Sequence, residues 1–144
     1  MKNSNKYKRY IFNMLDKQTI NKLLEAATSV MSNAHVPYSN FQVGASILYK
    51  DGTIEVGCNI ENASFGATIC AERTAISTGA AKGKLNIEAI CVTNLTDTMV
   101  TPCGICRQVI WEFGQNLPVI CSNKNGDYKI LTISELLPHA FDLN

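Results

Sequence analysis

The chain has 144 residues, of which 46% are hydrophobic and 17% charged, and this length and composition predict one compact domain. The first 14 residues carry four basic side chains and no acidic one, so a net charge of +1 for the chain leaves −3 on the remainder. We therefore expect a flexible basic extension, 1–14, followed by a single domain, 15–144. An acidic domain is a poor partner for a phosphate backbone, so we expect no binding of nucleic acid.

The sequence shows neither a membrane span nor a secretory signal. No run reaches the 18 or so apolar residues that a spanning helix needs, and the N-terminus has no apolar signal core. We therefore expect no membrane partner and a cytoplasmic location. In that compartment the six cysteines are expected to be reduced, buried or metal-bound rather than paired in disulfides.

Hydrophobic periodicity and turn residues predict the secondary structure. A helical stripe starts at Lys17 and ends before Pro37, and Asp51-Gly52 marks the tight turn of a hairpin. The run 87–94 is apolar with almost no alternation, as is typical of a central strand covered on both faces. This order predicts an α/β fold with a mixed five-stranded sheet and helices on both faces. After the first helix, the predicted elements are strands at 41–49 and 53–59, a helix at 69–81, a strand at 87–94, a helix at 103–113, strands at 118–122 and 128–132, and a short helix at 134–137.

Three cysteines and a glutamate form the pattern with the clearest chemical meaning. Cys70-Ala71-Glu72 precedes Pro102-Cys103-Gly104-Ile105-Cys106, and both segments fall where a loop becomes a helix. Helix N-termini stabilise thiolates. Cys70, Cys103 and Cys106 can hold a zinc ion and leave its fourth position open, which distinguishes a catalytic from a structural zinc site. Glu72 is then a carboxylate beside the metal that is free to move protons.

The residues next to these ligands predict an outer layer of the site. Three thiolates on Zn²⁺ leave a net negative charge, and we expect Arg73 and Arg107 to offset it by donating hydrogen bonds to the sulfurs. Gln108 is assigned to the same outer layer.

Two other interpretations of the cysteines remain open at this point. Cys103 and Cys106 have the spacing of a redox pair, although that function leaves Cys70 unexplained. A closed structural zinc needs a fourth ligand from another cysteine. The candidates are Cys58, Cys91 and Cys121. The last two lie in apolar strands, where buried, inert cysteine is common.

The two cysteine segments resemble the signature of the zinc-dependent nucleoside and base deaminases. Three more stretches make the chain similar, from about residue 15 to residue 141, to the small homotetrameric cytidine deaminases. These stretches are Pro37-Tyr38-Ser39-Asn40-Phe41-Gln42-Val43-Gly44-Ala45, Gly57-Cys58-Asn59-Ile60-Glu61-Asn62-Ala63 and Glu135-Leu136-Leu137-Pro138-His139-Ala140-Phe141. The resemblance implies a three-layer αβα sandwich and one zinc ion per subunit. It also implies deamination of cytidine and 2′-deoxycytidine to uridine and 2′-deoxyuridine, a reaction of pyrimidine salvage. Zinc-bound hydroxide would attack C4 of the base while Glu72 shuttles protons.

The same resemblance assigns the substrate contacts. Asn59 and Glu61 would bind the ribose hydroxyls, although both could instead cap a turn. Phe41 would pack against the pyrimidine, and the backbone of Ala71 would face the ring amide. Phe141 would reach the site of a neighbouring subunit and cover the base, so that the tetramer shares its active sites.

The chain departs from the family at Phe65, where a tyrosine is frequent, and it ends three residues after Phe141. We expect these departures to affect affinity rather than the reaction. Three other functions are considered: deamination of a cytosine-nucleoside antibiotic of the blasticidin S type, deamination of bases in nucleic acid, and a non-enzymatic zinc-binding module. Asn59 and Glu61 argue against the first, the acidic domain against the second, and Glu72 against the third.

Overall fold

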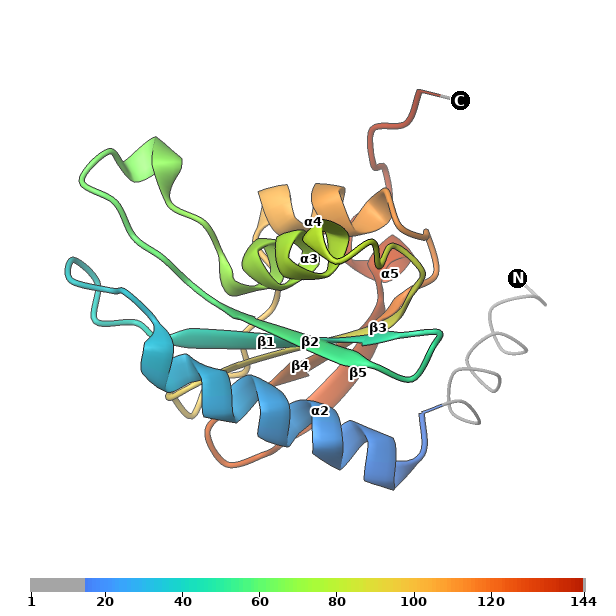
Figure 1. Ribbon diagram of the computed structural model, residues 1–144, viewed down its shortest axis with the longest axis horizontal. Helices are drawn as coiled ribbons and strands as arrows, with labels where there is room; N and C mark the ends of the chain where they lie inside the picture. The colour runs from blue at the N-terminus through green and yellow to red at the C-terminus, as the bar shows by residue number, and fades with distance from the viewer. Residues whose placement is uncertain (1–14, 144) are drawn as a thin grey trace.

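The computed structural model describes residues 15–143, so the expected extension at 1–14 lies outside the described residues. Figure 1 shows a sheet between two layers of helices. The elements in chain order are α2 (Lys17–Val30), η1 (Met31–Asn33), β1 (Val43–Tyr49), β2 (Ile54–Cys58), η2 (Phe65–Ala67), α3 (Ala71–Ala81), β3 (Ile87–Asn94), α4 (Gly104–Trp111), β4 (Pro118–Ser122), β5 (Tyr128–Thr132) and α5 (Ile133–Leu136).

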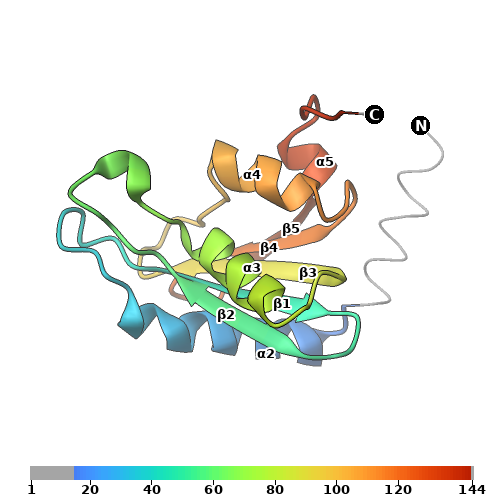
Figure 2. The ribbon, with the colours of Figure 1, turned by 45° about the horizontal axis from the view of Figure 1, so that its top comes forward.

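The five strands form one mixed sheet in the order β2-β1-β3-β4-β5. β3 and β4 are parallel, and the other neighbouring pairs are antiparallel. Helix α2 covers one face, while α3, α4 and α5 cover the other (Figure 2). The fold prediction of an α/β sandwich with helices on both faces is therefore confirmed.

The central strands are buried on both sides because each face of the sheet has its own hydrophobic core. All seven residues of β1 are buried. In β3, Ile90 and Val92 belong to the core beneath α3 and α4, whereas Ala89 and Cys91 face the core beneath α2. Alternate residues thus enter opposite cores, which explains why this strand has a nearly continuous apolar sequence.

Two glycines let the helices lie directly on the sheet. A Cβ atom at Gly44 would lie 1.9 Å from the carbonyl oxygen of Ala27 in α2. One at Gly57 in β2 would lie 2.3 Å from the backbone nitrogen of Ala75 and 2.6 Å from the carbonyl oxygen of Ala71, both in α3. The absence of a side chain at Gly57 therefore fixes the depth at which the first turns of α3 pack.

Several element boundaries differ from those predicted. Helix α3 begins at Ala71 instead of 69, because Cys70 is an N-cap residue with an extended backbone. Helix α4 ends at Trp111, two residues early. Helix α5 begins at Ile133, where Thr132 and Glu135 form a capping box. Within residues 15–143, no helix has both the length and the apolar character needed to cross a membrane.

Candidate active site

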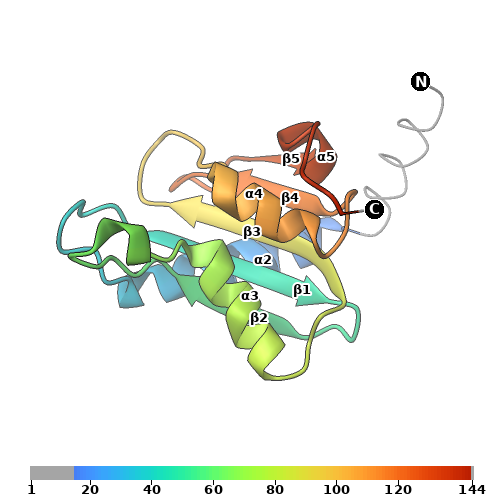
Figure 3. The same ribbon diagram turned by 90° about the horizontal axis from the view of Figure 1, so that it is seen from above.

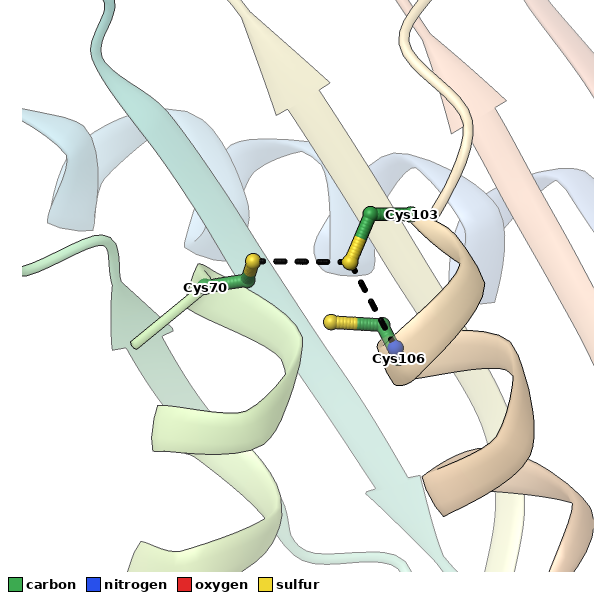
Figure 4. A group of neighbouring side chains, drawn as sticks. All are labelled: Cys70, Cys103 and Cys106. Carbon is green, nitrogen blue, oxygen red and sulfur yellow. Dashed lines mark hydrogen bonds between the residues drawn. The ribbon is translucent and has the colours of Figure 1, made fainter. Parts of the chain in front are cut away.

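Helices α3 and α4 start side by side on the same face of the sheet (Figure 3). The N-cap residue of each helix is a cysteine, Cys70 for α3 and Cys103 for α4. Together with Cys106, in the first turn of α4, these residues bring three sulfurs together (Figure 4). The three Sγ atoms of Cys70, Cys103 and Cys106 lie within 4.8 Å of one another. The Sγ atoms of Cys70 and Cys103 are 3.7 Å apart, and the backbone N–H of Cys106 donates to Cys103 Sγ.

This geometry fits a zinc ion. Zn–S bonds of about 2.3 Å in a tetrahedral arrangement separate neighbouring sulfurs by about 3.8 Å, close to the observed separation. Cys58, Cys91 and Cys121 do not belong to the group. Burial raises the pKa of Cys91 to about 12 and that of Cys121 to about 11, consistent with inert core thiols. The donor set is therefore three cysteine sulfurs with no fourth cysteine beside them in the part of the chain that the structure describes.

The electrostatic environment already favours a thiolate in the cluster. A hydrogen bond with Cys106, together with hydrogen bonds from Arg73 and Cys103, lowers the pKa of Cys70 to about 5. The hydrogen bond with Cys70 and burial raise the pKa of the Cys106 thiol. The lowered pKa favours the thiolate form of Cys70, which is the form that binds a metal ion.

Arg73 has the contact that the sequence predicted. Its Nη2 donates to Cys70 Sγ at 3.7 Å and to the carbonyl oxygen of Thr68 at 3.1 Å. These two bonds join the loop before α3 to the metal ligand, and they place a positive charge beside the thiolate.

Arg107 does not have the predicted contact. Its guanidinium donates to the carbonyl oxygen of Pro102 at 2.7 Å, to the carbonyl oxygen of Leu136 at 2.9 Å and to Thr101 Oγ1 at 3.1 Å. All three acceptors are oxygens, two of them in the loop that leads to Cys103. Arg107 therefore holds this loop and α5 together rather than donating to a sulfur.

Glu72 lies in the first turn of α3 and is 3% exposed. Burial, followed by the charge of Cys70, raises its pKa to about 7. A carboxyl group with this pKa can both accept and release a proton near neutral pH.

A cavity of about 220 Å³ opens onto this group. Its lining combines Cys70, Ala71, Glu72 and Cys103 with Phe41, Asn59 and Glu61. A second cavity of about 330 Å³, lined in part by Tyr38 and Phe65, adjoins it, and the two share Glu61 and Thr68. The structure thus brings most of the sequence-predicted residues to one place.

Asn59 and Glu61 also organise the loop opposite the cysteines. Asn59 Oδ1 accepts from the N–H of Val43 at 2.9 Å, and its Nδ2 donates to the carbonyl oxygen of Phe41 at 2.8 Å. Glu61 accepts from the backbone N–H groups of two loop residues and from the hydroxyl of Ser39. The Ser39 hydroxyl is the main cause of the lowered pKa of Glu61. Ser39 is a site residue to which the sequence reasoning gave no role.

Phe141 and Gln108 belong neither to the sulfur group nor to the lining of either cavity. Phe141 is 70% exposed, and its backbone pairs with the side-chain amide of Gln108. The C-terminal segment leaves α5 and runs beside α4 (Figure 3). Gln108 therefore contacts this segment, whereas the sequence analysis placed it in the outer layer of the metal site.

Comparisons with known proteins agree with this geometry. A family model described as the cytidine and deoxycytidylate deaminase zinc-binding region matches residues 17–122. A cytidine deaminase from Halalkalibacterium halodurans is 48% identical over 120 residues, which cover 83% of this chain and 91% of the relative. One from Sporosarcina psychrophila is 45% identical over 123 residues, or 85% and 90% of the two chains. A crystal structure of cytidine deaminase from Burkholderia pseudomallei superposes with a TM-score of 0.81 at 44% identity and covers 84% of this chain and 98% of its own.

Proposed function

The chain belongs to the cytidine and deoxycytidylate deaminase family, and from that membership we propose that it deaminates cytidine and 2′-deoxycytidine by hydrolysis. The products are uridine or 2′-deoxyuridine and ammonia. The observation that carries the proposal is that three zinc-competent sulfurs lie together, and that two of their cysteines, Cys70 and Cys103, line one cavity with the buried carboxyl of Glu72.

Cys70, Cys103 and Cys106 would hold one zinc ion per subunit. When bound, zinc supplies Lewis-acid activation of water at neutral pH. Arg73 stabilises the thiolate form of Cys70 through its hydrogen bond, and this lowers the cost of gathering three negative charges in one place.

Glu72 is the proton carrier in this proposal. Its carboxylate takes a proton from the attacking water and delivers it to N3 of the base as the C4–O bond forms. It then transfers a second proton from the added hydroxyl to the amino group, the C4–N4 bond breaks, and ammonia leaves. A pKa raised to about 7 by burial supports transfer in both directions.

Asn59 and Glu61 keep hydrogen-bonding capacity for a sugar. Asn59 Nδ2 has a second N–H beyond the one given to Phe41. The Glu61 carboxylate has about four acceptor positions, of which the loop uses three. One sugar hydroxyl can therefore accept from Asn59 and donate to Glu61. Phe41 would pack against the pyrimidine, with the backbone of Ala71 beside the ring amide.

The charge of the cavities favours a nucleoside over a nucleotide. Within residues 15–143, the lining of both cavities includes Glu61 but no Lys, Arg or His. A 5′-phosphate would meet a carboxylate with no compensating cation. The same lack of positive charge argues against a base within a nucleic acid, and the polar pair Asn59 and Glu61 argues for a ribose rather than an antibiotic of the blasticidin S type.

The proposal includes a homotetramer with shared sites. Phe141 is exposed and does not line the cavity of its own subunit, which supports a role in covering the base bound to a neighbour. We also propose that residues 15–144 form the catalytic domain and that the protein works in the cytoplasm, where its six unpaired cysteines stay reduced.

The test is a substrate panel. Purified, zinc-loaded protein is incubated with cytidine, 2′-deoxycytidine, deoxycytidylate and a cytosine-containing oligonucleotide, and ammonia release is measured. We expect turnover of the two nucleosides, with little or none of the other two. Unchanged cytidine would contradict the proposed function, whereas turnover of deoxycytidylate alone would contradict the argument from cavity charge.

A further inference from the structure

The side-chain amide of Gln108 binds Phe141 through two hydrogen bonds. Gln108 Nε2 donates to the carbonyl oxygen of Phe141 at 2.9 Å, and the N–H of Phe141 donates to Gln108 Oε1 at 3.1 Å. Both backbone polar groups of one residue are thus held by one side chain, much as a neighbouring strand would hold them. This pairing fixes the peptide planes on both sides of Phe141 and hence the direction in which its Cβ points.

A second contact holds the next residue of the tail. Trp111 Nε1 and Gln115 Nε2 lie 3.5 Å and 3.4 Å from Asp142 Oδ2. Gln108 and Trp111 are three residues apart and therefore share one face of α4. The C-terminal segment is thus bound to α4 at two consecutive residues. The same helix carries Cys106, one of the three clustered sulfurs, two residues before Gln108.

The held residue presents its ring to solvent. Phe141 is 70% exposed even though its backbone is fixed. Exposing an apolar ring forgoes the free energy of burying it, and hydrogen bonds that order a tail must overcome the loss of conformational entropy. Both costs are offset if the ring is buried against a second copy of the chain, because a pre-ordered side chain loses less entropy on binding.

We propose that Gln108 is a positioning residue, whose amide aims Phe141 at the active site of a second copy. This inference rests on the proposed function, in which Phe141 covers the base bound to a neighbouring subunit. The rival explanation is that Gln108 only attaches the C-terminus and stabilises α4.

A double-mutant cycle separates the two explanations. The variants are Gln108→Ala, Phe141→Ala and their combination, with Glu112→Ala as a matched control at the exposed C-terminal cap of α4. Each full-length, zinc-loaded protein is assayed for KM and kcat with cytidine, for zinc content and for oligomer mass. Hydrogen exchange at the Phe141 amide is measured in parallel, and this readout does not depend on activity.

If Gln108 acts through the Phe141 ring, Gln108→Ala raises KM about tenfold and changes kcat by less than about threefold. On the Phe141→Ala background the same change has no further effect on KM, since the ring it aims is gone. Exchange at the Phe141 amide accelerates in Gln108→Ala and stays slow in Glu112→Ala, which also keeps the wild-type KM.

Three outcomes would overturn the proposal. An equal rise of KM on both backgrounds would show that Gln108 does not act through the ring. Loss of zinc or of kcat in Gln108→Ala would indicate a structural role in α4. Wild-type protein that leaves cytidine unchanged, yet shows a Phe141 amide protected by Gln108, would refute the proposed function and the aiming role while leaving the pairing itself intact.

Discussion

Arg73 donates a hydrogen bond to the sulfur of Cys70 across 3.7 Å, from a position three residues further along the chain. This bond and the accompanying charge are among the causes of the low pKa of Cys70. Because the thiolate is the form that binds metal, we expect Arg73→Gln to weaken zinc binding by about 10–100-fold, as loss of a partner of a metal ligand does elsewhere. Competition with a chromogenic chelator measures this change.

Arg107→Gln is the matched control, since Arg107 donates to oxygens and not to a sulfur. It should lower the melting temperature but leave the zinc affinity closer to the wild-type value than Arg73→Gln does. Alkylation of the zinc-free protein adds a pH test. With a pKa of about 5, Cys70 is deprotonated above that pH, so its alkylation rate should rise through pH 5, and Arg73→Gln should move the rise to higher pH. Equal zinc affinities of the two arginine variants would contradict this assignment.

Glu72→Gln tests the proton carrier. The amide has nearly the same volume but cannot accept and return a proton, so we expect kcat to fall by about 10²–10⁴-fold. Zinc content, measured by atomic absorption, should remain at one ion per subunit, because Glu72 is not one of the clustered sulfur ligands. A variant that keeps both its zinc and its activity would remove Glu72 from the mechanism.

The bounds predicted from the sequence were most accurate for elements that a local sequence pattern determines. The strand at 87–94 was located to the residue, since burial on both faces requires a continuous apolar run. The predicted start of α3 was wrong. Cys70 is the N-cap residue, so it directly precedes the first helical residue while its own backbone is extended.

The parts of the candidate site that lie within short sequence motifs were predictable. Contacts between residues far apart in the sequence were less so. Arg107 follows Cys106 directly, yet adjacent residues of a helix point about 100° apart, and one of its acceptors comes from α5. Ser39 meets Glu61 across 22 positions of sequence. No spacing rule predicts such a contact, because it depends on how the loop before β1 folds back over the end of β2.

Gly57→Ala tests the close packing of α3 on β2. The added Cβ would lie 2.3 Å from the backbone nitrogen of Ala75, and backbone cannot move aside as a flexible side chain can. We expect a loss of about 1–3 kcal/mol in the free energy of unfolding, measured by urea denaturation. The displaced helix also carries Cys70, so zinc affinity should fall as well. Gly66→Ala is the control, since its Cβ would meet nothing within 4 Å, and a comparable loss there would contradict the packing argument.

The ion pairs of Glu55 with two lysines should make the free energy of unfolding depend on pH. Glu55 is 8% exposed, and its carboxylate accepts from Lys82 Nζ at 2.7 Å and Lys84 Nζ at 2.8 Å. The hydrogen bond from Lys82, followed by that from Lys84, lowers the pKa of Glu55 below its usual value. A carboxyl group whose pKa is lower in the folded than in the unfolded chain stabilises the fold at pH values above the pKa of the unfolded chain. This stabilisation is lost as the pH falls through the pKa of the folded chain.

Glu55→Gln should therefore cost about 1 kcal/mol in the free energy of unfolding at pH 7. The difference from wild type should shrink at acid pH, where the wild-type carboxyl is also protonated. Urea denaturation of both proteins at each pH measures it. Asp97→Asn is the control, because its ion pair with Lys124 is exposed on both sides and should contribute little. A Glu55→Gln deficit that stays constant from pH 7 to below the folded pKa would show that the lysines stabilise the residue by packing rather than by charge.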